Sequence, residues 1–180
     1  MLLLCNQEIT FNEFLLISPK LLYCHLLMSV ITDENGKDVL IEKFIEYCPN
    51  LIWFTYCCHP NVENVISKTP EEIFKVIQFP KTIAQIKDIP ESFDIGTFLK
   101  NVKKNKAFIS LEFKENCSEN FQNQLETIIE EILGTETFNY IPPLILFPEL
   151  NPEKKKGMSD LCLKEWLPYD PFLVETVLKD

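Results

Sequence analysis

The stretch "CPNLIWFTYCCH", Cys48–His59, places a proline–asparagine turn signal directly before a run of strand-forming residues. Its apolar positions Leu51, Phe54 and Tyr56 follow the pattern apolar-x-x-apolar-x-apolar, and aromatic and β-branched residues favour strands. Similar phrases occur elsewhere in the chain: "SPKLLYCHLLMS" from Ser18, "FPKTIAQIKDIP" from Phe79 and "KNKAFISLEFKEN" from Lys104.

These phrases recur at a nearly constant spacing, which predicts a repeat architecture. Pro19, Pro49 and Pro80 open the first three phrases and lie about 30 residues apart. The third phrase breaks its pattern at Asp88. The fourth phrase is followed by Asn116, at the position where the strand motif of leucine-rich repeats carries Asn or Cys.

Helical patterns lie between the strand phrases. Apolar residues recur there at a spacing of three and four, and Thr69, Asp94 and Ser118 stand where side chains cap helices. Gly134 is a stop signal for the last of them. The pattern predicts helices over 38–48, 69–79, 93–105 and 118–134.

Alternating strands and helices predict an α/β fold with parallel strands and crossover helices. A doubly wound sheet buries both strand faces and gives continuous apolar runs. Here "AQIKD" and "ISLEF" place polar residues between apolar ones. This favours a leucine-rich-repeat-like solenoid, with strands on one face and helices on the other. The doubly wound sheet is the alternative.

The end of the chain differs from the repeats. The proline-broken stretch over 139–157 predicts an extended, irregular cap. We therefore divide the chain into a repeat domain over 1–157 and a C-terminal segment over 158–180, either a loose tail or a short docked helix.

Composition excludes some classes of function. The net charge is −10 and all 17 basic residues are lysines, which disfavours nucleic-acid binding. No apolar run is long enough to span a membrane, and the N-terminus lacks the features of a signal peptide. The 7 cysteines are odd in number and unevenly spaced, which indicates reduced thiols in a cytoplasmic or nuclear protein. We expect Cys24 and Cys48 to pack as small apolar residues.

The sheet face away from the helices is the candidate partner-binding surface. If Leu51, Phe54 and Tyr56 face the helices, alternate residues face away and are exposed. Neighbouring Trp and Tyr side chains are typical of interface hot spots. The alternative is that the C-terminal tail or an N-terminal partner covers them. The predicted partner-binding residues are Tyr23, His25, Leu27, Trp53, Thr55, Cys57, Gln85, Lys87, Ser110 and Glu112.

The cluster Cys57, Cys58 and His59, with His25, supports a rival hypothesis of a thiol- or zinc-dependent enzyme. A structural zinc site needs spaced ligand pairs, whereas adjacent strand residues point to opposite faces. Ordinary packing, with Cys57 partly exposed, is the simpler interpretation. We expect no catalytic residues, metal or cofactor.

A family resemblance covers most of the chain, from residue 14 to 158. The pieces that carry it are "PESFDI" (Pro90–Ile95), "KKNKA" (Lys103–Ala107), "LETIIEEILGTE" (Leu125–Glu136) and "YIPPLILFP" (Tyr140–Pro148). They resemble the F-box-associated FTH domain, a leucine-rich-repeat-like family that is expanded in nematodes.

The resemblance implies a non-catalytic protein-binding module, similar to the substrate-recognition arm of a ubiquitin-ligase adaptor. In such adaptors an F-box binds a Skp1-type subunit and the repeats hold the target. This chain departs from that plan because no F-box precedes its repeats, which argues against a Skp1-type partner. A free binding module, an incomplete gene product and a truncated non-functional paralogue are the alternatives.

Overall fold

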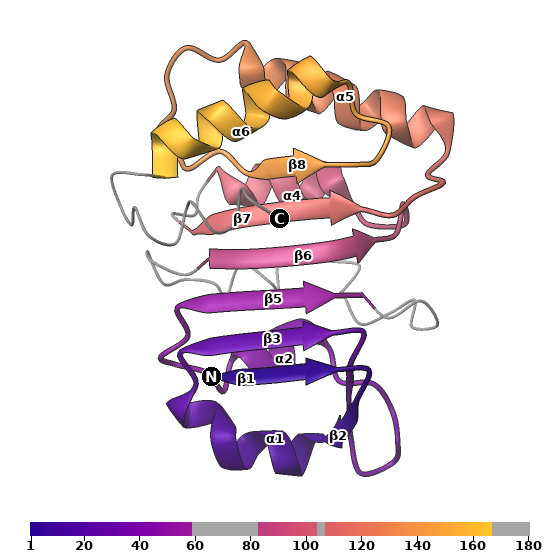
Figure 1. Cartoon of the computed structure of the whole chain (residues 1–180), viewed down its shortest axis with the longest axis vertical. Helices are drawn as coiled ribbons and strands as arrows, with labels where there is room; N and C mark the ends of the chain where they lie inside the picture. The colour runs from indigo at the N-terminus through magenta and orange to yellow at the C-terminus, as the bar shows by residue number, and fades with distance from the viewer. Residues whose placement is uncertain (59–82, 104–106, 167–180) are drawn as a thin grey trace.

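The structure is a computed structural model that describes residues 1–58, 83–103 and 107–166 (Figure 1). The strands are β1 (Leu2–Cys5), β2 (Glu8–Thr10), β3 (Tyr23–Leu27), β4 (Val30–Thr32), β5 (Trp53–Cys57), β6 (Ile83–Ile89), β7 (Phe108–Phe113) and β8 (Leu144–Leu146). The helices are α1 (Phe11–Ile17), the 3-10 turn η1 (Ser18–Lys20), α2 (Ile41–Ile45), α4 (Ile95–Val102), α5 (Glu119–Leu133) and α6 (Pro152–Trp166). The helix expected over 69–79 lies outside the described residues, as does His59.

Six of the strands form one sheet, in the order β1-β3-β5-β6-β7-β8. All five neighbouring pairs are parallel, which confirms the predicted α/β class. Within this sheet the spatial order follows the chain order without a reversal. Strands β2 and β4 pair separately, also in parallel.

The first two repeat phrases stack in register. Cys24 lies opposite Phe54 and His25 lies opposite Thr55, as the alignment of the first two phrases predicts. The third and fourth phrases are offset by one phrase position from the second, with Trp53 opposite Ile83 and Ile83 opposite Phe108. Residues paired in this way form rows across the sheet and lie on the same face.

The third phrase keeps its strand despite Asp88. Strand β6 continues to Ile89, but its register with β7 shifts between Ile86 and Ile89. Asp88 has a φ of 56°, in the left-handed region. The break expected at Asp88 is thus a bulge, which bends a strand without ending it.

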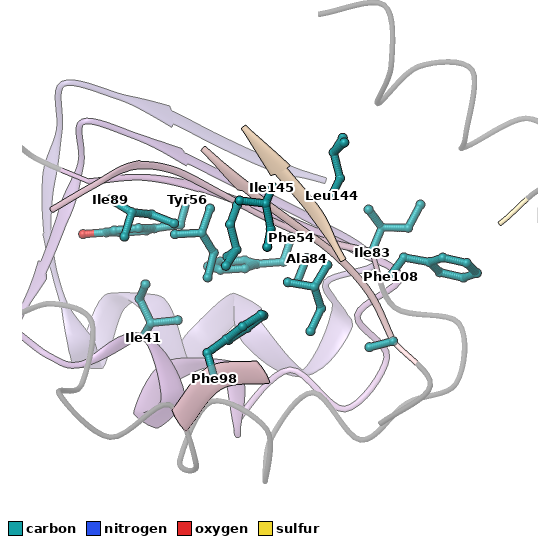
Figure 2. Packing of buried hydrophobic residues seen from close by; sticks show 14 of the residues in the cluster. Ile41, Phe54, Tyr56, Ile83, Ala84, Ile89, Phe98, Phe108, Leu144 and Ile145 are labelled. Atoms are coloured by element: carbon teal, nitrogen blue, oxygen red, sulfur yellow. The ribbon is translucent and has the colours of Figure 1, made fainter. Parts of the chain in front are cut away.

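The core lies between the sheet and the helices. Helices α2 and α4 lie behind the sheet in Figure 1. Figure 2 shows Ile41 of α2 and Phe98 of α4 on the side of the sheet to which Phe54 and Ala84 point. All four residues belong to the buried hydrophobic cluster, together with Tyr56, which confirms the predicted inward face of the second phrase.

Helices α4 and α5 begin at the predicted caps. The Asp94 side chain accepts a hydrogen bond from the Thr97 N–H at 2.9 Å, and Ser118 Oγ accepts one from Phe121 N–H at 3.4 Å. Gly134 is the C-cap of α5, as expected. Side-chain caps satisfy N–H groups that the helix leaves without partners.

Helix α2 is shorter than the predicted 38–48. Its first expected residues pair with β4 instead, because the Val39 N–H donates to the Ile31 carbonyl at 2.7 Å and Asp38 forms a bridge with Thr32. Leu40 is the N-cap of α2 and is 38% exposed.

The first twenty residues form elements that the repeat phrases did not predict. Strand β1 pairs with β3, so the strand of the first phrase is not at the edge of the sheet. Helix α1 starts with a capping box, in which Thr10 and Glu13 each accept from the other's backbone N–H. The sequence Thr10-x-x-Glu13 carries that signal.

The expected irregular cap over 139–157 is wrong from Pro152 onward. Asn151 Oδ1 accepts from the Glu153 N–H at 2.8 Å, and proline at the start of a helix has no N–H to lose. The resulting helix α6 continues to Trp166, across the predicted boundary between residues 157 and 158.

Helix α6 is docked on the preceding helix. Lys154 Nζ lies 2.6 Å from a Glu126 carboxylate oxygen and 2.8 Å from one of Glu130, both on α5. Met158 and Cys162 are fully buried. For the C-terminal segment the sequence left a loose tail or a docked helix as alternatives. Its described part, residues 158–166, is the docked helix.

Leu111→Ala tests the core. Leu111 is fully buried in β7, so we expect a loss of about 2–5 kcal/mol in the free energy of unfolding from lost burial and the cavity left behind. Leu16→Ala is the matched control because Leu16 is 81% exposed, and we expect a change within about 0.5 kcal/mol.

Urea denaturation of the three proteins measures both differences. Equal stability of the two variants would contradict the packing described above. A cooperative transition of the unsubstituted chain would argue against a paralogue that folds poorly.

Candidate functional site

We call the sheet face opposite α2 and α4 the strand face. Strand alternation and the observed register place all ten predicted partner-binding residues on it. These are Tyr23, His25, Leu27, Trp53, Thr55, Cys57, Gln85, Lys87, Ser110 and Glu112. Prediction from the strand phrases thus brought together residues that lie far apart in the chain.

The residues of the strand face form three rows across the strands. The first row is apolar and aromatic: Tyr23, Trp53, Ile83 and Phe108. The middle row is polar: His25, Thr55, Gln85 and Ser110. The third row contains Leu27, Cys57 and Lys87. Sequence reasoning missed Ile83 and Phe108, which the observed register places in the row of Trp53 although they stand one position earlier in their phrases.

The expectation that this whole face is exposed is wrong. Five of the ten residues are buried: Trp53, Thr55, Cys57, Gln85 and Ser110. The other five are half-buried. The exposure expected for Cys57 is also wrong, since only 7% of its surface is accessible. Strand alternation gives the direction of a side chain, but it does not reveal what packs over it.

One end of the strand face is covered by α6. The Trp166 ring is fully buried, and its centroid lies 5.2 Å from that of Phe108 in an edge-to-face arrangement. Trp166 Nε1 donates to the Pro142 carbonyl at 3.3 Å. Helix α6 therefore covers Phe108 at the β7 end of the first row.

The middle row contains a hydrogen-bonded chain of side chains. His25 Nδ1 lies 3.0 Å from Thr55 Oγ1, and the Thr55 hydroxyl donates to Gln85 Oε1 at 3.5 Å. Because a hydroxyl has one proton, Thr55 then accepts from a protonated Nδ1. A neutral His25 in this tautomer has an acceptor at Nε2.

Trp53 is the buried aromatic residue beside this chain. Its ring meets the His25 ring edge to face, with centroids 5.9 Å apart. Its buried Nε1–H has no hydrogen-bond partner in the described part of the chain. A buried donor without a partner costs about 1–3 kcal/mol, so the Trp53 N–H lowers the free energy of unfolding.

The third row combines a thiol with charges. Cys57 Sγ donates to Asp88 Oδ2 at 2.8 Å, and Lys87 Nζ lies 3.8 Å from Glu112 Oε2. The bulge at Asp88 brings its carboxylate to Cys57, which no spacing rule in the sequence indicates.

The accessible part of the strand face lies over β1 and β3. Leu3 is 53% exposed and pairs with His25. Met28, directly after β3, is 45% exposed. With half-buried Tyr23 and Leu27, Leu3 forms a mixed apolar and aromatic surface next to the His25 imidazole, and Met28 lies beyond it after the end of β3.

The cysteines behave as buried thiols. Burial, followed by the hydrogen bond to Asp88, raises the pKa of Cys57 to about 11, and burial raises the pKa of Cys58 to about 12. Cys58 belongs to the hydrophobic cluster whereas Cys57 lies on the strand face, so the two neighbours point to opposite sides as predicted. Cys24 and Cys48 pack in the core as expected.

The remaining observations concern disulfides, metal ligands, membrane spans and similarity to known proteins. All seven cysteines are free. In the described ranges, no three His, Cys, Asp or Glu residues are grouped so that they could hold a metal ion. None of the described helices has the length and apolar character needed to span a bilayer. No family model, curated protein or solved structure matches the chain.

His25 makes stability depend on pH. Burial, and then the charge of the amino terminus, lowers the pKa of His25 below its ordinary value of 6.5. The unfolded chain therefore binds a proton more readily, and stability falls as the pH drops below about 6.5. We expect His25→Asn, whose amide can still donate to Thr55, to lose less melting temperature between about pH 7.5 and 5.5 than the unsubstituted chain. An equal loss in both proteins would contradict this assignment.

Thiol labelling separates the packing interpretation from the thiol-enzyme hypothesis. Cys5 is exposed and the other six cysteines are buried, so a maleimide at neutral pH should modify Cys5 rapidly in dilute native protein and the rest slowly. Cys5→Ser should abolish the rapid phase. Rapid labelling of Cys57 or Cys58 would revive the hypothesis of a reactive thiol.

Proposed function

We propose that the chain is a non-catalytic protein-binding module of the cytoplasm or nucleus, and that its target binds the strand face over β1 and β3. The observation that carries the proposal is the accessible surface of Leu3, Tyr23 and Leu27 around the half-buried His25. From the sequence resemblance to the FTH family, we further propose a role similar to the recognition arm of an F-box ubiquitin-ligase adaptor.

We also propose that the fold is a leucine-rich-repeat-like solenoid, as in the FTH family. Two features support this assignment. The sheet order follows the chain order, and α2 and α4 lie on the same side of the sheet. A doubly wound sheet reverses its strand order and places helices on both faces. In a solenoid each unit is stabilised mainly by its neighbours, and one face is available for a partner.

The chemistry of the accessible surface supports a protein target. Aromatic and aliphatic side chains supply area that can be desolvated, and interface hot spots are enriched in such residues. The His25 Nε2 acceptor adds a directional contact at the centre of that area. The Lys87–Glu112 pair contributes one charge of each sign to the rim.

The rival enzyme hypothesis has less support from the geometry. An activated cysteine needs a lowered pKa or an adjacent base, whereas burial raises the pKa of both Cys57 and Cys58. His25 uses Nδ1 in its contact with Thr55. Metal analysis of purified protein is the direct test of the zinc version, and stoichiometric zinc would overturn our choice.

Affinity capture with paired variants tests the proposal. Leu27→Glu places a charge in the accessible strand face, whereas Leu133→Glu places the same charge on α5, where Leu133 is 37% exposed. We expect a target captured by the unsubstituted chain to bind Leu27→Glu at least about tenfold more weakly, because an unpaired charge in an apolar interface is costly. Leu133→Glu should retain it.

The outcomes separate the proposed roles. Unchanged melting temperatures of both variants show that binding alone is affected. Loss of the target with both variants, or with neither, would contradict binding at the strand face. Recovery of Skp1-type and cullin subunits would support a ligase role, whereas a defined target without them would favour a free module.

A further inference from the structure

The turn that follows β4 contains the dipeptide Asn35-Gly36, and both residues are exposed. Of the 4 glycines in the chain, only Gly36 follows an asparagine. Asparagine is chemically labile, because the backbone nitrogen of the next residue can attack its side-chain amide carbon. A side chain on that next residue hinders the attack. Gly36 has none, and no non-neighbouring heavy atom of the described residues lies within 4 Å of the place where a Cβ would stand.

Hydrogen bonds to Asp33 hold this turn together. The Asp33 N–H donates to the Lys37 carbonyl at 2.7 Å, and the Gly36 N–H donates to the Asp33 carbonyl at 3.0 Å. The Asp33 carboxylate accepts from the N–H of Asn35 at 2.8 Å and from that of Lys37 at 2.9 Å. The N–H groups of Lys37 and then Asn35 lower the pKa of Asp33, so this carboxylate is charged at neutral pH. Gly36 has a φ of 71°, which glycine adopts without strain.

We propose that Asn35 is a modification site, at which the folded chain converts asparagine to aspartate and isoaspartate without an enzyme. The exposed amide and the adjacent glycine nitrogen supply both reacting groups, and water is the other reactant. This chemistry does not depend on which target the strand face binds.

The reaction has two steps that balance. In the first, the Gly36 nitrogen forms a bond to Asn35 Cγ, the bond from Cγ to Nδ2 breaks, and the amide group leaves as ammonia with the proton of the Gly36 N–H. The product is a five-membered succinimide ring. In the second step water opens this ring. Cleavage of the bond to Cγ gives aspartate with the original backbone, whereas cleavage of the bond to the Asn35 backbone carbonyl gives isoaspartate.

The turn restrains this reaction without preventing it. Rotation of Asn35 toward its neighbour must break the bonds that the N–H groups of Gly36 and Lys37 make to Asp33. An intramolecular hydrogen bond contributes about tenfold or less to an equilibrium, because water replaces it. Exposed turns also open locally at low cost. We therefore expect the folded chain to react more slowly than the unfolded chain, by at most about a hundredfold for two such bonds.

The two products differ in their effect on the chain. Both add one negative charge to a net charge of −10, but only isoaspartate adds a carbon to the backbone. The turn joins segments that pair through the bridge of Thr32 with Asp38 and through the Val39 N–H, which donates to the Ile31 carbonyl at 2.7 Å. We expect the purified isoaspartate form to melt at a lower temperature than fresh Asn35→Asp protein, which carries the charge alone.

Peptide mapping by mass spectrometry tests the proposal on folded protein kept at neutral pH and physiological temperature for several weeks. The Asn35 peptide should gain the mass of an amide-to-acid conversion. A carboxyl methyltransferase specific for isoaspartate should transfer labelled methyl groups to it. Asn35→Gln should stay unmodified, because its longer side chain would have to close a larger ring. Asn50 and Asn116, which precede Leu and Cys, are internal references and should change far more slowly.

Paired variants test the restraint by the turn. Asp33→Ala removes the carboxylate that holds the turn, so Asn35 should react up to about tenfold faster. Glu34→Ala removes a neighbouring exposed carboxylate and should leave the rate unchanged. A folded chain that keeps Asn35 intact while the urea-unfolded chain converts it would overturn the proposal, as would conversion of Asn50 at the same rate. Equal rates in the two variants would overturn the role assigned to Asp33.

Discussion

The in-register parallel pairing of the repeat phrases is the constraint on which the rest of the structure depends. Side chains alternate along a strand, so a slip of one residue would move every inward side chain of that strand to the other face. With Phe54 opposite Ala84 and Cys24, the inward row is apolar and can pack on α2 and α4. The same register creates the three rows of the strand face.

Both faces of the sheet bury polar groups, and on the helix-packed face the Tyr56 hydroxyl has no hydrogen-bond partner among the described residues. Burying polar side chains without partners costs free energy. The middle row reduces this cost because Thr55 contacts both His25 and Gln85. Trp53 Nε1–H has no such compensation among the described residues. The strand face is thus partly apolar and partly hydrogen-bonded.

The positions of the strands along the chain and their parallel direction could be predicted because they depend on local signals. Proline turns, the apolar pattern and the caps Asp94 and Ser118 each indicate an element within a few residues. Exposure could not be predicted in this way. The burial of Phe108 by Trp166 joins segments almost sixty residues apart, and the bulge that brings Asp88 to Cys57 has no sequence signature. The start of α6 before residue 158 could not be predicted, because prolines usually indicate broken structure whereas Pro152 begins a helix.

The two ends of the sheet differ in a way that favours binding near the N-terminal end. At β8, α6 covers the edge and Trp166 fills the space beside Phe108, so apolar surface is already buried within the chain. At β1 and β3, leucine and aromatic side chains flank a half-buried imidazole whose lowered pKa keeps it neutral at physiological pH. A neutral imidazole is cheaper to desolvate than a charged one. Covering the accessible part of the strand face therefore costs little desolvation free energy.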